Sequence, residues 1–411
     1  MFCGACMHDN TLARALMDLG VEVSLIPTYT PIRVDERNVS SQRVLLGGIN
    51  MYLDALLPGW NRIPRPLVNW LDSPGILKLA SQFGISSDAE KLGKLAVALL
   101  QGAAGPEHHE VAEFARVLGR ELQPDVICYS NALLVGTLQP LKQQFAGKVF
   151  CLLQGDDVFL EDLVDPYREQ SLHLIRTQAL QFDGFLVHSQ YYRDFMSEYL
   201  QLPIDKFHVV PLGIDLDGYD GQPRESAGQP FTVGYFARIC PEKGLQVLVE
   251  ALRILRRQRQ DIVLKTAGYL GTRDQPFFET LQRIAADLGD AFQYCGSPPD
   301  HAGKVAFLKS LDLLSVPTVY REPKGLYVLE AMANGVPVVQ PRHGAFPEMI
   351  AATDGGRLVN PEDPADLARV IGELADDHDQ RRELAGNAHA AVRRVYGMRT
   401  MAEATLAALT Q

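Results

Sequence analysis

The sequence predicts an α/β protein of two doubly wound domains that face each other across a cleft. Runs of Val, Ile, Leu and Phe alternate with amphipathic helical runs in two separate series, a pattern typical of parallel sheets covered by helices. A Gly- and Asp-rich stretch without periodicity separates the two series at residues 213–230. With 411 residues, 46% of them hydrophobic, the chain is long enough to form two packed cores.

The position of that stretch predicts the domain organisation. We expect an N-terminal domain over residues 1–212, a linker over 213–230, a C-terminal domain over 231–385 and a final helical segment over 386–411. The final segment is long enough to cross back to the N-terminal domain. Because doubly wound domains bind ligands outside the carboxyl ends of their strands, we expect a ligand in the cleft.

The first series starts with an amphipathic helix from Thr11, for which Asn10 is the expected N-cap. An α/β unit of this kind normally opens with a strand and a Gly-rich turn, and only nine residues precede Asn10. We therefore expect the true start to lie upstream of Met1. The strands expected in this domain span 21–26, 125–129, 148–153, 184–187 and 207–210, with a helix over 111–121.

Residues 27–106 lack a clear period and contain several prolines together with both tryptophans, Trp60 and Trp70. One interpretation is an insertion packed on the N-terminal domain. The alternative is a lid or an acceptor-binding surface, because long loops in compact domains are often functional.

The second series repeats the alternation of strand and helix. Its expected strands span 231–236, 262–267, 292–295, 313–316 and 336–340, and its expected helices span 245–257, 301–310, 325–334 and a run from about 365. One further helical run covers 387–409.

The composition argues against several classes of protein. A formal net charge of −11 and the lack of a long Lys/Arg run argue against a nucleic-acid partner. No stretch approaches the roughly 18 apolar residues of a membrane span, and the N-terminus lacks a signal-peptide pattern. We expect a cytoplasmic protein, and a peripheral contact with the inner face of a membrane stays open.

The six cysteines are spread along the chain and predict reduced thiols. Cys3 and Cys6 have the spacing of a metal or redox pair, but a structural zinc site needs four ligands and the sequence offers no second pair. We therefore expect a structural or incidental role for this pair and no bound metal.

The segment that follows the strand at 231–236 carries two cations, Arg238 and Lys243, just before the helix expected at 245–257. A helix N-terminus has unpaired N–H groups and the positive end of the helix dipole, so an anion is favoured there. The segment predicts a diphosphate site. The alternative is a turn with two solvated surface cations.

Two carboxylates flank the start of the helix expected at 325–334. Glu322 lies just outside this helix and Glu330 lies inside it, with Pro323 and Gly325 between them. At helical rise the two carboxylates are about 12 Å apart. Such a pair can bind two hydroxyl-rich parts of one extended ligand, its sugar and its ribose. The alternative is a capping carboxylate and an unrelated surface glutamate.

The chain resembles the retaining glycosyltransferases of family 4 across residues 205–350. The resemblance rests on the Arg238/Lys243 pair, the Glu-x7-Glu spacing and the run Gly-Val-Pro-Val-Val-Gln-Pro-Arg-His-Gly-Ala-Phe-Pro-Glu-Met-Ile that follows. It implies the GT-B fold of two Rossmann-like domains. It also implies transfer of a hexose-like sugar from a UDP-, GDP- or ADP-sugar to a hydroxyl of a sugar, lipid or small molecule, with retained configuration and without a metal or cofactor.

The resemblance also implies roles for single residues. Arg238 and Lys243 would bind the donor diphosphate and stabilise its departure, Glu322 would contact the transferred sugar, and Glu330 would hold the ribose. Of these, Glu322, Arg238 and Lys243 form the implied catalytic set. The other implied donor contacts are Lys324, Gly325 and Leu326 through their backbone, and Gly268 and Gly296 beside the base.

The N-terminal domain departs from the family pattern. Many relatives have a histidine after the strand equivalent to 149–153, where this chain has Gln154-Gly-Asp-Asp. We therefore expect Gln154 or Asp156 to contact the sugar. Asp156 and Asp157 are interpreted as loop residues that face the cleft, not as a metal-binding pair.

Two alternatives to a glycosyltransferase stay open. One is another enzyme on the same fold, such as a sugar-nucleotide epimerase or a phosphorylase, because a fold does not fix a function. The other is a non-catalytic sugar-nucleotide-binding protein. The lack of a Gly-x-Gly-x-x-Gly motif after a strand argues against an NAD-dependent enzyme.

Overall fold

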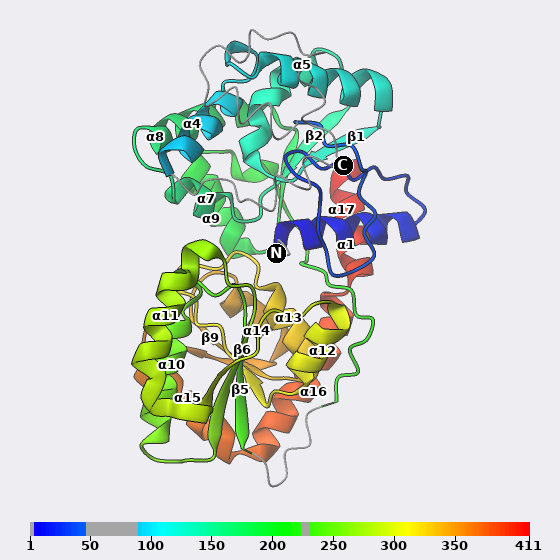
Figure 1. The fold of residues 1–411 in the computed structure, drawn as a ribbon. Helices are drawn as coiled ribbons and strands as arrows, with labels where there is room; N and C mark the ends of the chain where they lie inside the picture. The colour runs from blue at the N-terminus through cyan, green and yellow to red at the C-terminus, as the bar shows by residue number, and fades with distance from the viewer. Residues whose placement is uncertain (1–3, 47–88, 223–229) are drawn as a thin grey trace. The chain divides into compact units, whose positions relative to one another are not determined.

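The computed structural model describes residues 4–46, 89–222 and 230–411, which form two compact units with one parallel sheet each (Figure 1). The N-terminal unit comprises residues 5–210 and 402–411, and the C-terminal unit comprises residues 211–401. Cys3, Trp60 and Trp70 lie outside the described residues. Within the described ranges, no helix is long and apolar enough to cross a membrane.

The N-terminal unit is built on a parallel sheet in the order β1-β2-β3-β4. The strands are short apolar runs, and most of their residues are buried, as expected where both faces of a parallel sheet are covered. They are β1 (Val126–Tyr129), β2 (Lys148–Leu152), β3 (Gly184–Val187) and β4 (Phe207–Val209). The helices are α1 (Gly4–Asp18), α4 (Ala89–Leu100), α5 (His108–Arg116), α6 (Leu138–Lys142), α7 (Asp156–Glu161), α8 (Tyr167–Gln178) and α9 (Gln190–Leu200).

Helix α1 spans Gly4–Asp18, so the helix predicted from Thr11 is confirmed, but its expected start and its Asn10 cap are wrong. Asn10 is buried within the helix, where its side chain donates to Arg37 O and accepts from Val39 N. These hydrogen bonds tie α1 to the segment that follows it. The asparagine is therefore used for a tertiary contact and not for capping.

Two further predictions for this unit are wrong. Among the described residues, 21–26 pairs with the rest of the chain through a single bridge, Leu25 with Ser40, and forms no strand. Its residues alternate between half-buried and exposed, which gives too little apolar surface for a place inside the sheet. Part of the stretch expected to be irregular forms α4, whose apolar face is buried.

The C-terminal unit has a parallel sheet in the order β10-β9-β8-β5-β6-β7. On one side of β5 the sheet continues with β6 and β7, and on the other side it continues with β8, β9 and β10. The strand order therefore switches between β5 and β8. The strands are β5 (Phe231–Phe236), β6 (Ile262–Ala267), β7 (Phe292–Tyr294), β8 (Leu313–Leu314), β9 (Val338–Pro341) and β10 (Gly356–Val359). The helices are α10 (Leu245–Arg256), α11 (Gln275–Ile284), α12 (His301–Lys309), α13 (Leu326–Ala333), α14 (Phe346–Thr353), α15 (Pro364–Asp376) and α16 (His378–Val395).

The strands predicted at 231–236 and 262–267 are confirmed with the same bounds. The helical run predicted at 387–409 is wrong as a single helix, because α16 ends at Val395 and α17 spans Met398–Thr410. The backbone of Ile214 causes the break: its N–H donates to Tyr396 O at 2.9 Å, and its carbonyl accepts from Met398 N at 2.9 Å. The carbonyl of Tyr396 and the N–H of Met398 therefore bond to Ile214 and not to groups within a continuous helix.

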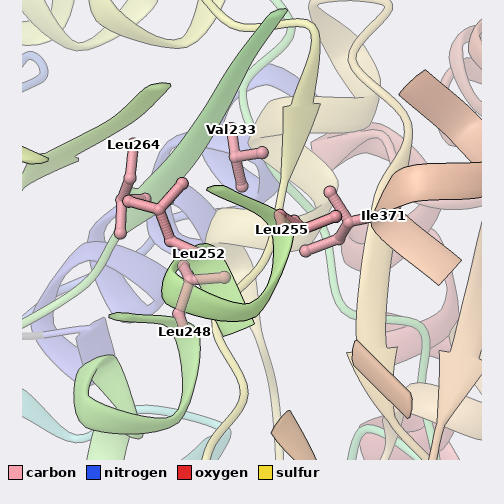
Figure 2. A pocket seen from close by; sticks show the side chains of 6 residues that line it. All are labelled: Val233, Leu248, Leu252, Leu255, Leu264 and Ile371. Carbon is pink, nitrogen blue, oxygen red and sulfur yellow. The ribbon is translucent and has the colours of Figure 1, made fainter. Parts of the chain in front are cut away.

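The core of the C-terminal unit packs α10 against the sheet (Figure 2). The gap between the side chains in this view has no room for a water molecule, so it is tight packing and not a ligand site. The side chains are Val233, Leu248, Leu252, Leu255, Leu264 and Ile371.

Helix α17 belongs mostly to the N-terminal unit, although it is last in the chain. Ala408 is buried in a cluster with Leu152 of β2, Leu186 of β3 and Val210, and Leu409 packs against the same cluster. The end of the chain thus covers part of a sheet formed some 200 residues earlier.

Candidate functional site

Two loops meet at the switch point of the C-terminal sheet. The loop after β5 carries Arg238 and Lys243, and the loop after β8 carries Tyr320 and Glu322. In a doubly wound sheet the helices that follow these two strands cover opposite faces, which leaves the loops side by side at the carboxyl edge. The fold therefore brings together residues about 80 positions apart in the sequence.

A glycine allows the two loops to approach closely. Gly244 has φ of +74°, and a Cβ at this position would lie 1.7 Å from Pro317 O. Val319 N donates to Glu242 O at 2.9 Å, which joins the two loops through their backbones. A side chain at position 244 would separate the loops and the groups that they carry.

The Glu322 carboxylate is the centre of this arrangement. Its Oε2 accepts from Lys243 Nζ at 2.5 Å, from Tyr320 OH at 2.7 Å and from Tyr327 OH at 3.0 Å. Burial by itself raises the pKa of Glu322, but the charge of Lys243 and the three hydrogen bonds outweigh it and lower the pKa to about 2. Glu322 is therefore a buried carboxylate that stays ionised at neutral pH.

Lys243 connects the two loops through its ammonium group. Besides Glu322, it donates to Tyr320 OH at 2.6 Å. Its Nζ lies 4.9 Å from the ring centroid of Tyr320 and 5.3 Å from that of Tyr327, within cation–π range. The sequence predicted Lys243 and Glu322 as separate contacts, whereas the structure shows them as one ion pair inside an aromatic frame.

Arg238 is the more accessible of the two cations. Its side chain is 44% exposed, its Nε donates to Cys240 Sγ at 3.2 Å, and its Nη2 lies 4.0 Å from Glu242. Arginine has five N–H donors in a planar fork, and among the described residues the hydrogen bond to Cys240 uses only the one on Nε. Arg238 is thus able to bind an anionic group from solvent.

Helix α13 begins at the same edge of the sheet. Gly325 precedes it with φ of +74°, a left-handed conformation that suits glycine, and Lys324 N lies 3.4 Å from Glu322 Oε1. The first N–H groups of a helix, here those of Leu326 and Tyr327, have no acceptor within the helix, whereas Val328 N donates to Gly325 O at 2.9 Å. The predicted backbone contacts at 324–326 therefore lie next to Glu322.

Glu330 lies about one turn after the start of α13 and pairs with a residue that the sequence did not single out. Lys304 Nζ of α12 lies 2.8 Å from Glu330 Oε1, and both side chains are buried. Lys304 lies one turn before the buried Leu308 on the same helix face, which is the only sequence signal for a core-facing lysine.

Gly268 and Gly296 lie together at the ends of β6 and β7. Gly268 N donates to Gly296 O at 3.0 Å. Gly268 has φ of +141°, and a Cβ there would lie 1.8 Å from Ala237 O, so the loop after β5 also packs against it. The two glycines predicted to border the base thus adjoin the Arg238 loop through backbone contacts.

His343, in the loop after β9, is a residue near Glu322 to which the sequence assigned no role. Its Nε2 lies 2.9 Å from Thr318 O, and burial lowers its pKa. Two residues later, Ala345 N donates to Glu322 O at 2.8 Å. This loop therefore fixes the backbone of Glu322 through Ala345 N.

Gln154 and Asp156 lie in the N-terminal unit, after β2. Gln154 Nε2 donates to Asp9 Oδ1 at 2.9 Å and to Ser130 O at 3.2 Å. Asp156 accepts from Ala132 N at 2.6 Å and from Gln154 N at 3.1 Å, and burial raises its pKa to about 6. Asp156 therefore fastens the loops after β1 and β2 to each other.

The interpretation of Asp156 and Asp157 as loop residues is wrong. They are the first two residues of α7, where acidic side chains are favoured by the helix dipole. Asp157 Oδ1 accepts from Tyr192 OH at 2.6 Å, and both residues are buried.

The two parallel sheets and the strand order define the class: the chain is an α/β protein of two Rossmann-like domains. It belongs to the glycosyl transferases group 1, a family that matches residues 221–391. A GDP-mannose-dependent alpha-(1-6)-phosphatidylinositol monomannoside mannosyltransferase of Mycolicibacterium smegmatis is 32% identical over 290 residues, which cover 66% of this chain and 72% of the relative.

Other curated relatives match over a shorter part. An MMP alpha-(1->4)-mannosyltransferase of Mycolicibacterium hassiacum is 32% identical over 217 residues, or 52% of this chain and 50% of the relative. The chain thus spans about half the length of several curated relatives that it matches.

Solved structures confirm the GT-B fold. A sucrose-phosphate synthase from Thermosynechococcus elongatus has a TM-score of 0.69 at 20% identity, covering 97% of this chain and 90% of its own. The Anabaena HepE structure in complex with UDP has a TM-score of 0.64 at 21% identity, and the match covers 75% of this chain and 83% of the HepE chain.

Proposed function

We propose that this protein is a retaining glycosyltransferase that moves a sugar from a nucleoside-diphosphate sugar to an acceptor hydroxyl of a sugar, lipid or small molecule. The observation that carries the proposal is the Lys243–Glu322 pair at the switch point, with Arg238 beside it on the same loop. One anion-binding cation and one hydroxyl-binding carboxylate in direct contact suit a ligand in which a phosphate is joined to a sugar.

The cations would bind the diphosphate. Lysine has three N–H donors, and two of those of Lys243 are used by Glu322 and Tyr320, so the third can reach a phosphate oxygen. Arg238 adds a planar fork that suits phosphate, and the N-terminus of α13 adds backbone donors. Together they would stabilise the negative charge that develops as the nucleoside diphosphate leaves, so no metal is needed in this scheme.

Glu322 would hold a hydroxyl of the transferred sugar. Its Oε2 is occupied by three donors, whereas Oε1 accepts only the long 3.4 Å hydrogen bond from Lys324 N among the described residues, so Oε1 has a lone pair left for a sugar hydroxyl. The ionised state of Glu322 makes it an acceptor only, so it would orient the sugar rather than protonate it. The acceptor hydroxyl would attack from the face that the diphosphate leaves, and the departing phosphate would take its proton.

The relatives support this proposal by what their names state. One is a GDP-mannose-dependent mannosyltransferase, and the HepE structure contains UDP. We therefore expect the donor to carry one of the common nucleoside diphosphates.

Binding and transfer assays on the full chain test the proposal. We expect UDP, GDP or ADP to raise the melting temperature, because a ligand that binds the folded state stabilises it. Arg238→Ala should weaken binding of that nucleotide by about 10- to 100-fold, the range for one or two charge-assisted hydrogen bonds. Arg253→Ala, which removes an exposed arginine paired with Asp287, is the matched control and should leave binding unchanged.

Glu322→Gln separates binding from chemistry. It keeps the size of the side chain and removes the charge, so sugar transfer should fall much more than nucleotide affinity. Unchanged transfer in this variant would show that the role of Glu322 is wrong, and no binding of any of the three nucleotides would refute the donor site. Binding without transfer or donor hydrolysis would favour a non-catalytic sugar-nucleotide-binding protein.

A further inference from the structure

We infer that Lys304 is a positioning residue that sets Glu330 to bind the vicinal hydroxyls of the donor ribose. The inference rests on the proposed function and on the ribose contact that the family resemblance implies for Glu330. Lys304 Nζ lies 2.8 Å from Glu330 Oε1, and the two side chains are only 4% and 9% exposed. The pair joins α12 to α13.

The pair occupies positions where apolar residues would be expected. Residues 327–333 of α13 are all buried, and Glu330 is the only charged residue among them. Lys304 and Leu308 are the buried residues of α12, so the lysine stands on the core-facing side of that helix. A buried ion pair is a weak source of stability, and apolar replacements of similar shape are often neutral or stabilising. Packing alone does not explain a charged pair here.

The hydrogen bonds of Glu330 indicate what the pair is for. Lys304 takes Oε1, while among the described residues Oε2 has no hydrogen-bond partner. A hydrogen bond to one oxygen restricts the rotation of the carboxylate, so its second oxygen is presented over a narrower range of directions. Two adjacent hydroxyls of a ribose suit such an acceptor, because each can donate to a different lone pair.

The place of Glu330 in the fold agrees with this assignment. It lies five positions after Gly325, which corresponds to a rise of about 7.5 Å along α13 from the switch point. The Glu322 contact lies at the start of that helix, so the sugar and the ribose of one donor can reach the two carboxylates. Lys304 would act through Glu330 and would not touch the ribose itself.

The test compares nucleotides with and without ribose hydroxyls. Dissociation constants are measured by calorimetry for UDP, GDP and ADP and for their 2′,3′-dideoxy analogues, with the full chain. We expect the wild type to prefer the ribonucleotide that it binds best over its dideoxy analogue by about 10- to 100-fold, the range for a hydrogen bond or two to a charged group. In Lys304→Met this preference should fall to within about threefold, with affinity for the dideoxy analogue unchanged.

Two further variants keep the test decisive. Lys309→Met removes an exposed lysine of the same helix that pairs with Asp220, and it should keep the wild-type preference. Lys304→Arg keeps the charge and should retain most of the preference. If Lys304→Met does not fold, Lys304→Arg and Lys304→Gln are compared instead, and Lys304→Gln should lose the preference.

Three results would overturn the inference. An unchanged preference in Lys304→Met, or in Lys304→Gln if Met is not tolerated, would show a purely structural pair. Equal loss of affinity for ribonucleotide and dideoxy analogue would show the same. A wild type that binds nucleotides without any ribose preference would remove the role of Glu330 but leave the diphosphate site intact, whereas a wild type that binds no nucleotide would refute the proposed function as well.

Discussion

Replacing Lys243 by Met leaves the Glu322 carboxylate buried without its cation. The surroundings of Glu322 lower its pKa from the ordinary 4.5 to about 2, against a burial effect that acts in the opposite direction. That difference corresponds to about 3 kcal/mol in favour of the ionised folded state. Breaking a buried pair by removing one partner costs about 3–5 kcal/mol, which agrees with this value. We expect Lys243→Met to lower the free energy of unfolding by about 3 kcal/mol at pH 7.

The pH dependence of this loss identifies its cause. A carboxyl with a lowered pKa stabilises the folded protein above its unfolded pKa, and this stabilisation disappears as the pH falls toward the folded pKa of about 2. The difference between wild type and variant should therefore be largest above about pH 5 and should shrink as the pH falls from 5 toward 3. Urea titrations followed by circular dichroism at several pH values measure it.

Lys309→Met is the control for this experiment. Lys309 pairs with Asp220, but both side chains are about half exposed, and such pairs contribute little. We expect a loss below about 1 kcal/mol with no pH dependence of the same form. A Lys243→Met variant that behaves like this control, or whose loss stays constant down to pH 3, would refute the explanation based on an uncompensated buried carboxylate.

Three further predictions follow from single contacts. Tyr320→Phe removes one hydrogen bond to Glu322 and should destabilise by about 1–2 kcal/mol in urea titrations; a neutral result would mean that the bond is absent in solution. Gly244→Ala should destabilise by more than about 2 kcal/mol, because its Cβ would clash with backbone at positive φ, whereas Gly386→Ala in α16, with open space around it, should raise the melting temperature. Burial raises the pKa of Asp156 to about 6, so protonated Asp156 stabilises the folded protein at low pH and this stabilisation is lost as the pH rises through 6. The free energy of unfolding of Asp156→Asn should therefore rise relative to that of the wild type between pH 3 and pH 7, by up to about 3 kcal/mol. A difference that stays constant over this range would contradict the prediction.

The sequence predicted the C-terminal sheet well because its strands are continuous apolar runs between helices. Phe231–Phe236 is buried in its first five residues and Ile262–Ala267 is buried in four of its six, and short runs of this kind suit a strand inside a parallel sheet. The stretch 21–26 misled the prediction because it has the alternation of a strand but pairs with the chain only at Leu25. Asn10 misled it because a side chain that can cap a helix can equally bind a distant backbone.

The sequence predicted which residues form the candidate site, but it did not predict which of them contact each other. Arg238, Lys243 and Glu322 stand out because charged residues follow apolar strands, and the carboxyl ends of strands are where ligands bind. The contact between Lys243 and Glu322 joins residues 79 positions apart, and it depends on a strand order that no local pattern reveals. Lys304 escaped notice because a lysine on a helix is ordinary until its partner on another helix is known.

The last helix gives the chain an unusual order of assembly. Residues 402–411 pack onto a sheet whose last strand ends at Val209, and residues 211–401 form a complete second unit in between. A ribosome therefore makes the whole C-terminal unit before it releases the piece that covers Leu152 and Leu186 of the N-terminal sheet. The half that is synthesised first is the half that is finished last, and a premature stop near residue 400 would leave the apolar surface of the N-terminal unit exposed.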